Sequence, residues 1–294
     1  MTAQAEGMTI SPTWKLGDRL VHRLGFGAMR LALGPNGTER DPDQGIAVLR
    51  RAVDLGVDHI DTAAFYFLGR VSANDLIRRA LAPYPDDLVI ATKVGPSRNA
   101  EGEHQPEARP DQLRGQVEQN LRELGRDHLD LVYLRIGTSL DRGSGSLAER
   151  FGVLAELREQ GLIRHLGISN VGHEHLAEAS GIAPVTAVQN WYGLSKRDDD
   201  ALLDTCTERE IAFVPFFSVH GGAGNLSDGV VAGIAAARGV TEAQVLLAWT
   251  LHRAPNVLAI PGTGSVTHLD ENVAAGALEL STEELDRLNS ATNA

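Results

Sequence analysis

The sequence has little that would tie it to a secreted protein or a membrane protein. Cys206 is its single cysteine among 294 residues, so no disulfide can form within the chain, and a reducing cytoplasm is the favoured compartment. No run approaches the roughly 18 apolar residues that a membrane span needs, and the N-terminus has neither a basic nor an apolar targeting segment. These absences predict a soluble, cytoplasmic protein in which residues 1–12 form a flexible tail.

Positive charge is also scarce. The chain has 27 lysines and arginines against 39 aspartates and glutamates, which gives a net charge of −12. Nucleic acids and anionic membranes select basic surfaces, so neither is an expected partner. Aromatic residues make up only 5% of the chain, but 43% of it is hydrophobic and 22% charged, as in ordinary folded proteins with a sizeable core. Disorder and coiled coil are therefore excluded as overall descriptions.

Short apolar segments rich in β-branched residues alternate with segments of helical period. This alternation predicts repeated strand–helix units around a parallel sheet. The expected strands are residues 24–28, 57–61, 88–93, 129–134, 163–168, 185–189, 211–215 and 257–260. The expected helices are residues 43–55, 74–81, 110–124, 147–160, 173–179, 198–209, 229–238, 241–251 and 266–275. Gly125 should end a helix in the left-handed conformation, and Ser281 with Glu284 predicts the capped start of a last helix.

Units of this number and length favour an α/β fold with one domain over residues 1–294, a closed (β/α)8 TIM barrel. A short N-terminal β-hairpin around Gly17 should precede it, and a C-terminal extra helix should follow it. An open doubly wound sheet is the alternative. That fold should carry a glycine-rich dinucleotide motif at its first turn, but Arg30 stands where the last small residue belongs. Residues 143–148 match the pattern well beyond the fourth strand, so we interpret them as a flexible connection.

Polar residues stand where several of the expected strands end. They are Asp61, Lys93, Arg135, Ser169, Asn170, Gln189 and Asn190. In a barrel the carboxyl ends of all strands meet at one mouth, where barrel enzymes carry their chemistry. Removing a charge from water costs several kcal/mol unless an opposite charge is close, so we expect Asp61 and Lys93 to pair.

Tyr66 follows Asp61 by five residues, in a segment that can fold over the same mouth. An ammonium beside a phenol stabilises the phenolate, so the phenol releases its proton more readily. We therefore predict that Asp61 holds Lys93, that Lys93 activates Tyr66, and that the phenol gives a proton to a developing alkoxide. A salt bridge near a surface tyrosine is the alternative that spacing alone leaves open.

These residues belong to an ordered set of motifs. The set comprises His59-Ile-Asp61-Thr-Ala63 followed by Tyr66, Ala91-Thr-Lys93, Gly167-Ile-Ser169-Asn170, Val188-Gln189-Asn190 and Ile260-Pro-Gly262-Thr263. In this order, over about residues 14–290, the chain resembles the aldo-keto reductase superfamily. The resemblance implies a barrel that binds NADP(H), less often NAD(H), across its mouth and reduces a small-molecule carbonyl substrate, an aldehyde or ketone, by hydride transfer.

The resemblance assigns catalytic roles to four positions. Tyr66 would be the proton donor, Lys93 its activating neighbour and Asp61 the anchor of the lysine. The family's fourth residue, a histidine, is replaced here by Arg135. A guanidinium stays charged and only donates hydrogen bonds, so it can stabilise an oxyanion but cannot act as a base. A salt bridge to an acidic loop or to a cofactor phosphate is the alternative role for Arg135.

The resemblance also implies a set of cofactor-binding residues. Ser169, Asn170 and Gln189 would bind the nicotinamide carboxamide. Phe216 would stack on the nicotinamide ring, with core packing as the alternative. Ser218 begins a glycine-rich segment suited either to a pyrophosphate or simply to a flexible loop. The residues expected around the adenosine 2′-phosphate and the adenine are Gly262, Thr263, Ser265, His268, Glu271 and Asn272.

Two departures from the family bear on specificity. Many members place lysine and arginine at the 2′-phosphate, whereas Gly262 and His268 stand at those positions here. NADP(H) remains the expected cofactor, with NAD(H) as the alternative. Phe67 and Leu68 follow Tyr66 where the family has glycine, which predicts either an apolar substrate pocket or local packing. No metal site is expected, and we interpret the pair of histidines at residues 173–175 as a solvated surface.

The leading hypothesis is an NAD(P)H-dependent oxidoreductase that reduces an aldehyde or ketone to the alcohol. One alternative is a cofactor-binding regulatory or partner-binding subunit with slow turnover, which Arg135 motivates. Another is an enzyme that acts mainly as an alcohol dehydrogenase. The sequence carries no signal for an oligomeric state.

Overall fold

The computed structural model describes residues 12–34, 38–99, 102–137, 140, 142–219 and 229–291. Its central element is a parallel sheet of seven strands in the order β11-β10-β9-β8-β7-β4-β3. These strands are β3 (Phe26–Gly27), β4 (His59–Asp61), β7 (Val89–Val94), β8 (Leu129–Arg135), β9 (Ile163–Ser169), β10 (Val185–Gln189) and β11 (Ala212–Phe213). Each lies within a segment where the sequence predicts a strand or extends it by one residue.

The segment at residues 257–261 closes this sheet into a ring. Val257 forms a parallel bridge with Phe213 of β11, and Ala259 forms one with Leu24, just before β3. The Gly25 amide donates a hydrogen bond to the Ala259 carbonyl at 2.8 Å. The eighth expected strand is thus present as two single bridges, one to each edge, and the predicted (β/α)8 barrel is confirmed.

Strands one and seven are shorter than expected, because both border this irregular segment. Within the expected strand at residues 24–28 only β3 is a strand, and within residues 211–215 only β11 is. Beyond β3 the two backbones approach closely: a Cβ atom on Gly262 would lie 2.4 Å from the Gly27 carbonyl oxygen. Glycine is therefore required where the first and last strands meet.

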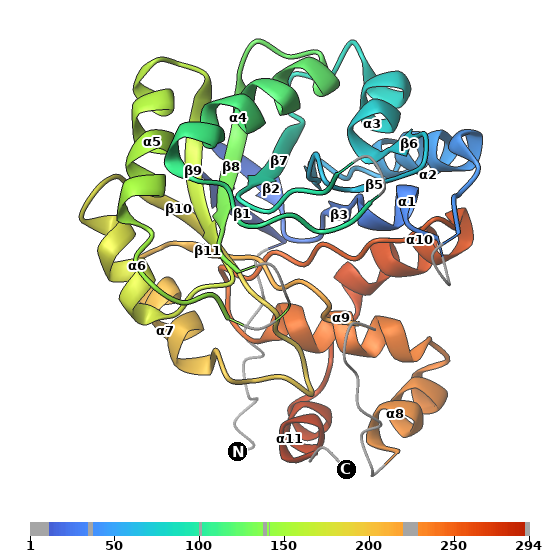
Figure 1. Ribbon diagram of the computed structural model, residues 1–294. Coiled ribbons are helices and arrows are strands. Elements are labelled where there is room, and N and C mark those ends of the chain that lie inside the picture. The colour runs from blue at the N-terminus through green and yellow to red at the C-terminus, as the bar shows by residue number, and fades with distance from the viewer. Residues whose placement is uncertain are drawn as a thin grey trace.

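Helices surround the barrel (Figure 1). They are α1 (Met29–Ala32), α2 (Pro42–Asp54), α3 (Ala73–Leu81), α4 (Pro110–Leu124), α5 (Ala148–Glu159), α6 (His173–Ser180), α7 (Asp200–Glu208), α8 (Val230–Arg238), α9 (Glu242–His252), α10 (Val266–Ala274) and α11 (Thr282–Ser290). As predicted, Gly125 ends α4 with φ of 65°, and Ser281 forms a reciprocal capping box with Glu284 at the start of α11. Among the described residues no single helix is long and apolar enough to cross a membrane, although the bent pair α8 and α9 passes together.

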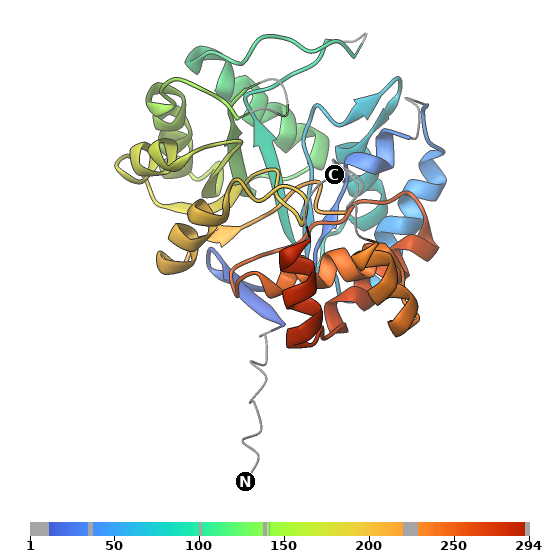
Figure 2. The same ribbon diagram turned by 90° about the horizontal axis from the view of Figure 1, so that it is seen from below.

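The predicted hairpin, β1 (Thr13–Leu16) and β2 (Arg19–His22), covers the end of the barrel where the strands begin (Figure 2). Leu16 and Val21 are buried in one apolar cluster with barrel residues such as Val89 and Leu131. The turn of the hairpin is held by Asp18, whose carboxylate lies 2.6 Å from the His165 Nε2 atom of β9. The hairpin therefore supplies the apolar floor of the barrel interior.

An ion pair fastens the C-terminal extra helix to its neighbour. Arg238 at the end of α8 and Glu284 in α11 lie 2.5 Å apart, Nη2 to Oε2. The hydrogen bond from Arg238 lowers the pKa of Glu284 to about 2, from an ordinary value of 4.5. A carboxylate with a lowered pKa stabilises the fold above its unfolded pKa, and that stabilisation is lost as the pH falls through the folded pKa.

We expect Glu284→Gln to lower the urea midpoint of unfolding at pH 7, because it removes this charge while glutamine can still serve in the capping box. The difference from wild type should shrink as the pH falls from about 4.5 toward 2. The matched control is Asp270→Asn, which removes an ion pair with Arg51 whose two side chains are each 44% exposed; such pairs contribute little. Equal midpoints for Glu284→Gln and wild type at pH 7 would contradict this assignment.

Candidate active site

The side chains that point into the barrel change in kind along each strand. They are apolar where the strands begin, and they are charged or polar at the rim, where the strands end. Residues two apart point to the same side of a strand. On β7 the inward residues are Val89 and Ala91, both in the interior cluster, and then Lys93. The ends of β4 and β10 bring Asp61 and Gln189 to the same level. The rim is thus set by strand register, which the hydrophobic pattern specifies.

A buried ion pair lies at the centre of this rim. The Nζ atom of Lys93 donates to Asp61 at 2.5 Å and to the Thr62 carbonyl at 3.0 Å. Gln189 donates from Nε2 to the second Asp61 oxygen at 2.7 Å. Lys93 is 3% exposed and Asp61 4%, so both charges are removed from water. The carboxylate is bonded through both oxygens, which is what a buried charge requires.

Tyr66 completes the expected trio. The Lys93 ammonium lies 4.8 Å from the centroid of the Tyr66 ring, and the phenol ring is half-buried. Burial alone lowers the pKa of Lys93, but its interactions with the Asp61 carboxylate and the Tyr66 phenol outweigh burial and raise that pKa above its ordinary value. Lys93 therefore remains a cation at neutral pH, next to the phenol.

The segment after Tyr66 forms a small hairpin that the sequence did not predict. Strand β5 (Phe67–Leu68) pairs antiparallel with β6 (Val71–Ser72), and Gly69 takes a left-handed φ of 55° in the turn. The Tyr66 carbonyl accepts a hydrogen bond from Ala73 at 2.9 Å, at the base of this hairpin. Phe67 borders a small cavity beside Lys93.

Arg135 ends β8 on the same rim. Its Nη1 atom lies 3.2 Å from the Ser169 hydroxyl, and its guanidinium carbon lies 5.0 Å from the centroid of the Phe216 ring. Burial lowers the pKa of the guanidinium, and the nearby Tyr66 and Asp61 offset part of that effect. The guanidinium thus occupies the face of the aromatic ring that the resemblance assigns to the nicotinamide.

The three residues expected at the carboxamide differ in their hydrogen bonds. Ser169 is fully buried at the end of β9. Asn170 adopts a left-handed φ of 66° and its side-chain Nδ2 donates to the Ile136 carbonyl at 2.9 Å, so part of its amide supports the backbone. Gln189 has a buried Oε1 atom with no partner among the described residues, and this acceptor is available to a ligand.

Ser218 follows β11 and is buried, at 8% exposure. Its backbone lies against Gly193, where a Cβ atom would be 3.3 Å from the Ser218 Cα. The predicted pyrophosphate segment continues from here to residue 225, and residues 220–225 lie outside the described part of the chain.

The residues expected at the 2′-phosphate gather where the last strand enters α10. Ser265 is the N-cap of α10, and its hydroxyl accepts from the His268 amide at 3.4 Å. The Thr263 hydroxyl accepts from the Ser265 amide at 3.1 Å. Glu271 and Asn272 lie one helical turn beyond His268. A helix N-terminus with free N–H groups and short hydroxyl side chains is suited to an anion.

Arg40, which the sequence reasoning missed, lies at this same place. Its guanidinium covers Gly264 so closely that a Cβ atom there would meet Arg40 Nη1 at 2.4 Å. The Arg40 Nε atom is buried and has no hydrogen-bond partner in the described residues. No sequence motif links Arg40 to Gly264, which lies more than two hundred residues further along the chain. The one local signal is the glycine itself, because a side chain at position 264 would collide with another group.

The histidines at residues 173–175 are not both on a solvated surface, so that interpretation was wrong for one of them. His175 is 3% exposed. Its Nδ1 accepts from the Gly172 amide at 3.0 Å, and its Nε2 lies 3.0 Å from the Gly145 carbonyl. It ties the start of α6 to the preceding loop. Within the described residues, no group of three or more His, Cys, Asp or Glu side chains is placed to hold a metal ion.

The fold and the rim together define a class: a (β/α)8 barrel whose mouth carries an ammonium–carboxylate pair beside a phenol. Residues 23–293 match the model of the Aldo/keto reductase family. The chain therefore belongs to the aldo-keto reductases, which are oxidoreductases, and the resemblance drawn from its motifs is confirmed.

Two relatives extend over nearly the whole chain. The chain is 47% identical over 283 residues to pyridoxine 4-dehydrogenase of Escherichia coli, covering 95% of this chain and 98% of the relative. It is 37% identical over 279 residues to an uncharacterised oxidoreductase of Schizosaccharomyces pombe, covering 94% and 89%.

Solved structures of aldo-keto reductases are similar to this chain over nearly its whole length. The thermostable aldo-keto reductase Tm1743, crystallised with the inhibitor epalrestat, has a TM-score of 0.79 at 30% identity and covers 95% of this chain and 98% of its own. An aldo-keto reductase from Klebsiella pneumoniae in complex with NADPH has a TM-score of 0.78 at 30% identity, with 96% and 95% covered.

We expect Lys93→Met to destabilise the protein by about 3–5 kcal/mol, because it leaves Asp61 as an unpaired charge inside the barrel. Adding Asp61→Asn should recover part of the loss, since the two changes act on one interaction. The control is Lys15→Met at an exposed position, which should change stability by less than about 0.5 kcal/mol. Urea unfolding measures all three, and a Lys93→Met variant as stable as the control would show that the pair does not carry this energy.

Proposed function

We propose that the protein is an NADP(H)-dependent oxidoreductase that interconverts an aldehyde and an alcohol, with Tyr66 as the proton donor in reduction. The observation that carries this proposal is the Lys93 ammonium, fixed by Asp61 at 2.5 Å and lying 4.8 Å from the Tyr66 ring. A fixed positive charge stabilises the phenolate that forms when the phenol gives up its proton. Proton transfer to the developing alkoxide therefore becomes easier.

The side chains at the mouth fit the cofactor. NADPH, when bound, supplies the hydride. Gln189 presents a buried Oε1 acceptor that has no partner in the described part of the chain, which suits the amide hydrogens of a carboxamide. Arg40 places a permanent cation against Gly264, which suits a 2′-phosphate. Arg40 thus compensates for the two cations missing at Gly262 and His268, so we favour NADP(H) over NAD(H).

Arg135 stands where the family has a histidine, which can act as a neutral hydrogen-bond donor to the substrate. Its guanidinium is held near the Ser169 hydroxyl and carries positive charge toward the rim. It can donate to the carbonyl oxygen and stabilise negative charge that develops there, but it cannot accept a proton. In this proposal Tyr66 alone transfers the proton, and Arg135 orients the carbonyl.

The substrate class follows from the most informative relative. Identity of 47% over 95% of the chain links it to pyridoxine 4-dehydrogenase. We therefore propose that this protein interconverts pyridoxine and its 4-aldehyde, pyridoxal. The aromatic ring of this substrate is compatible with Phe67, which borders the cavity beside Lys93.

A regulatory or partner-binding subunit is the second candidate, and one observation favours it. The Arg135 guanidinium covers the Phe216 ring at 5.0 Å, where the resemblance expects the nicotinamide to stack. If the guanidinium stayed on the Phe216 ring when the cofactor was bound, the nicotinamide could not stack there. The protein would then bind the cofactor without turnover. Consumption of NADPH with pyridoxal supports the enzyme, whereas fluorescence quenching by NADPH with no turnover on any aldehyde supports the subunit.

We expect Tyr66→Phe to lower kcat for pyridoxal reduction by about 10²–10⁴-fold, because it removes the proton donor. NADPH affinity, measured by fluorescence titration, should stay close to wild type. Tyr84→Phe is the matched control, because the Tyr84 hydroxyl donates to the Leu124 carbonyl at 2.6 Å and borders the basal end of the barrel instead of the rim. Full activity of the Tyr66→Phe enzyme would remove this mechanism.

We expect Arg135→His to raise turnover of small aldehydes, because a neutral imidazole can orient the carbonyl and also relay protons. Without the guanidinium, the face of the Phe216 ring should also be open to the nicotinamide, so NADPH should bind more tightly. Steady-state kinetics across a panel of aldehydes measures the first effect. Lower turnover on every aldehyde would mean that the arginine serves the enzyme's own substrate.

We expect Arg40→Gln to weaken binding of NADPH and 2′,5′-ADP by about tenfold or more, because a charge-assisted bond to the phosphate is lost. NADH and 5′-ADP lack the 2′-phosphate, so their affinities should not change. Arg51→Gln is the control, because Arg51 also contacts α10 but already pairs with Asp270 at 2.8 Å. An equal loss of affinity for both cofactors would assign Arg40 to general folding of the mouth instead.

A further inference from the structure

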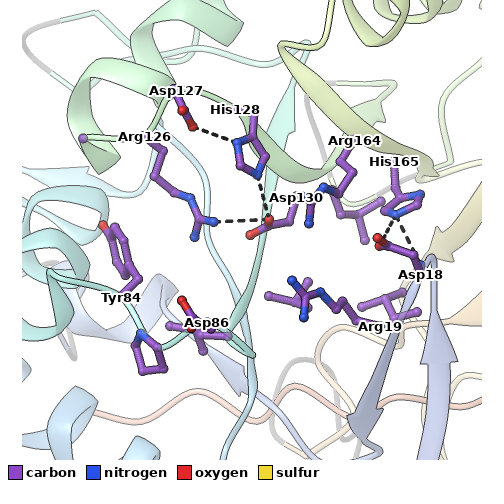
Figure 3. Close-up of a pocket in the computed structure, with 16 residues that line it drawn as sticks. Asp18, Arg19, Tyr84, Asp86, Arg126, Asp127, His128, Asp130, Arg164 and His165 are labelled. Carbon is purple, nitrogen blue, oxygen red and sulfur yellow. Dashed lines mark hydrogen bonds and ion pairs between the residues drawn. The ribbon is translucent and has the colours of Figure 1, made fainter.

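A second cavity, of about 560 Å³, lies at the end of the barrel opposite to the rim (Figure 3). It is bordered by the hairpin, by the segments that lead into β7 and β8, and by the first residues of β9. From Val89 at this cavity to Lys93 at the rim is four residues of strand, or about 13 Å. A volume of this size is enough for a drug-sized molecule, and none of the residues of the rim borders it.

Arginines from three different elements border this cavity. Arg19 comes from β2, Arg126 from the segment after α4 and Arg164 from β9. In Figure 3 their guanidinium groups point toward the middle of the cavity from different sides. Neither Arg19 nor Arg164 forms a hydrogen bond or ion pair through its side chain with any described residue, and the Arg126 Nη1 atom is buried without a partner. The buried Arg126 donor is costly unless a ligand satisfies it. Arg19 is exposed and Arg164 half-buried, so both guanidinium groups are accessible to an anion from solvent.

The carboxylates around the cavity are mostly engaged already. Asp18 lies 2.6 Å from His165 Nε2, and Asp127 lies 2.7 Å from His128 Nδ1. The Asp130 carboxylate accepts from the Ile90 amide at 3.0 Å and from Arg126 Nη2 at 3.3 Å. Asp86 also borders the cavity; it is exposed, and no hydrogen bond or ion pair joins its carboxylate to another described residue. Besides Asp86, the charged side chains with unused hydrogen-bonding capacity around the cavity are therefore, among the described residues, the arginines.

The walls suit a ligand with an uncharged body as well as an anionic group. Leu16, Leu88 and Leu131 form an apolar floor that continues into the barrel core. The Tyr84 ring forms one side, with the Arg126 guanidinium 5.1 Å from its centroid. Guanidinium groups bind phosphate oxygens through paired N–H donors. The cavity therefore combines an anion-binding cluster with space for a ring.

We propose that this basal cavity binds a small phosphate monoester, with Arg19, Arg126 and Arg164 around the phosphate and the organic part over the apolar floor. Such a site is separate from the mouth and goes beyond the reaction proposed above. A ligand held there contacts the hairpin together with the starts of β7, β8 and β9.

Calorimetric titration of the full-length protein with phenyl phosphate tests the proposal, with and without saturating NADPH. We expect one site, whose affinity falls at least about tenfold in the double variant Arg19→Gln, Arg164→Gln. Inorganic phosphate should bind more weakly than phenyl phosphate, and phenol should not bind, because each lacks one part of the ligand. The control Arg209→Gln removes an exposed arginine that does not border the cavity and should bind as wild type does.

Three results would overturn the proposal. They are no binding of phenyl phosphate to wild type at millimolar concentration, equal affinity of the double variant, and displacement of phenyl phosphate by NADPH, which would place the phosphate at the mouth. Unchanged melting temperature and NADPH affinity of the double variant show that its fold is intact. Because the titration needs no turnover, failure of the proposed reductase activity would not affect it.

Discussion

The ion pair between Lys93 and Asp61 inside the barrel is the interaction on which the rest of the site depends. Bringing these two charges out of water costs several kcal/mol for each ion. The cost is offset only because the carboxylate is bonded through both oxygens, to Lys93 and to Gln189, and the ammonium also reaches the Thr62 carbonyl. These partners come from β4, β7 and β10, so the pair forms only when the register of all three strands is correct.

The interior below the pair keeps water away and makes the pair strong. Tyr133 lies fully buried beneath the rim, where burial and the Asp61 charge raise the pKa of its phenol well above the ordinary value. Its ring occupies the place where a side chain at Gly167 would be, since a Cβ atom there would lie 2.5 Å from the ring. The two residues are direct partners in the pairing of β8 and β9. Tyr133 thus serves as packing, whereas Tyr66 is half-buried at the mouth, where we propose that it donates the proton.

Much of the rim could be predicted from sequence because it follows from one rule: parallel strands end at one edge, and inward positions repeat every second residue. That rule placed Asp61, Lys93, Arg135 and Gln189 together without any tertiary information. It could not place Arg40, whose contact with Gly264 depends on how two loops far apart in the chain pack. The same limit applies to the β5–β6 hairpin, which is too short for a periodic pattern, and to the buried His175.

In this acidic chain, lysine and arginine occupy different kinds of site. Of its 27 basic residues only Lys15, Lys93 and Lys196 are lysines. Lys93 stands where a compact point charge must fit between a carboxylate and a phenol. The cations at the two proposed phosphate sites are arginines, whose planar donors match phosphate oxygens. With a net charge of −12, the chain as a whole repels anions at a distance, but charges more than about 8 Å apart in water are largely screened at physiological salt. Anion binding in such a protein therefore depends on local, partly buried guanidinium groups, and their placement matters more than the overall charge.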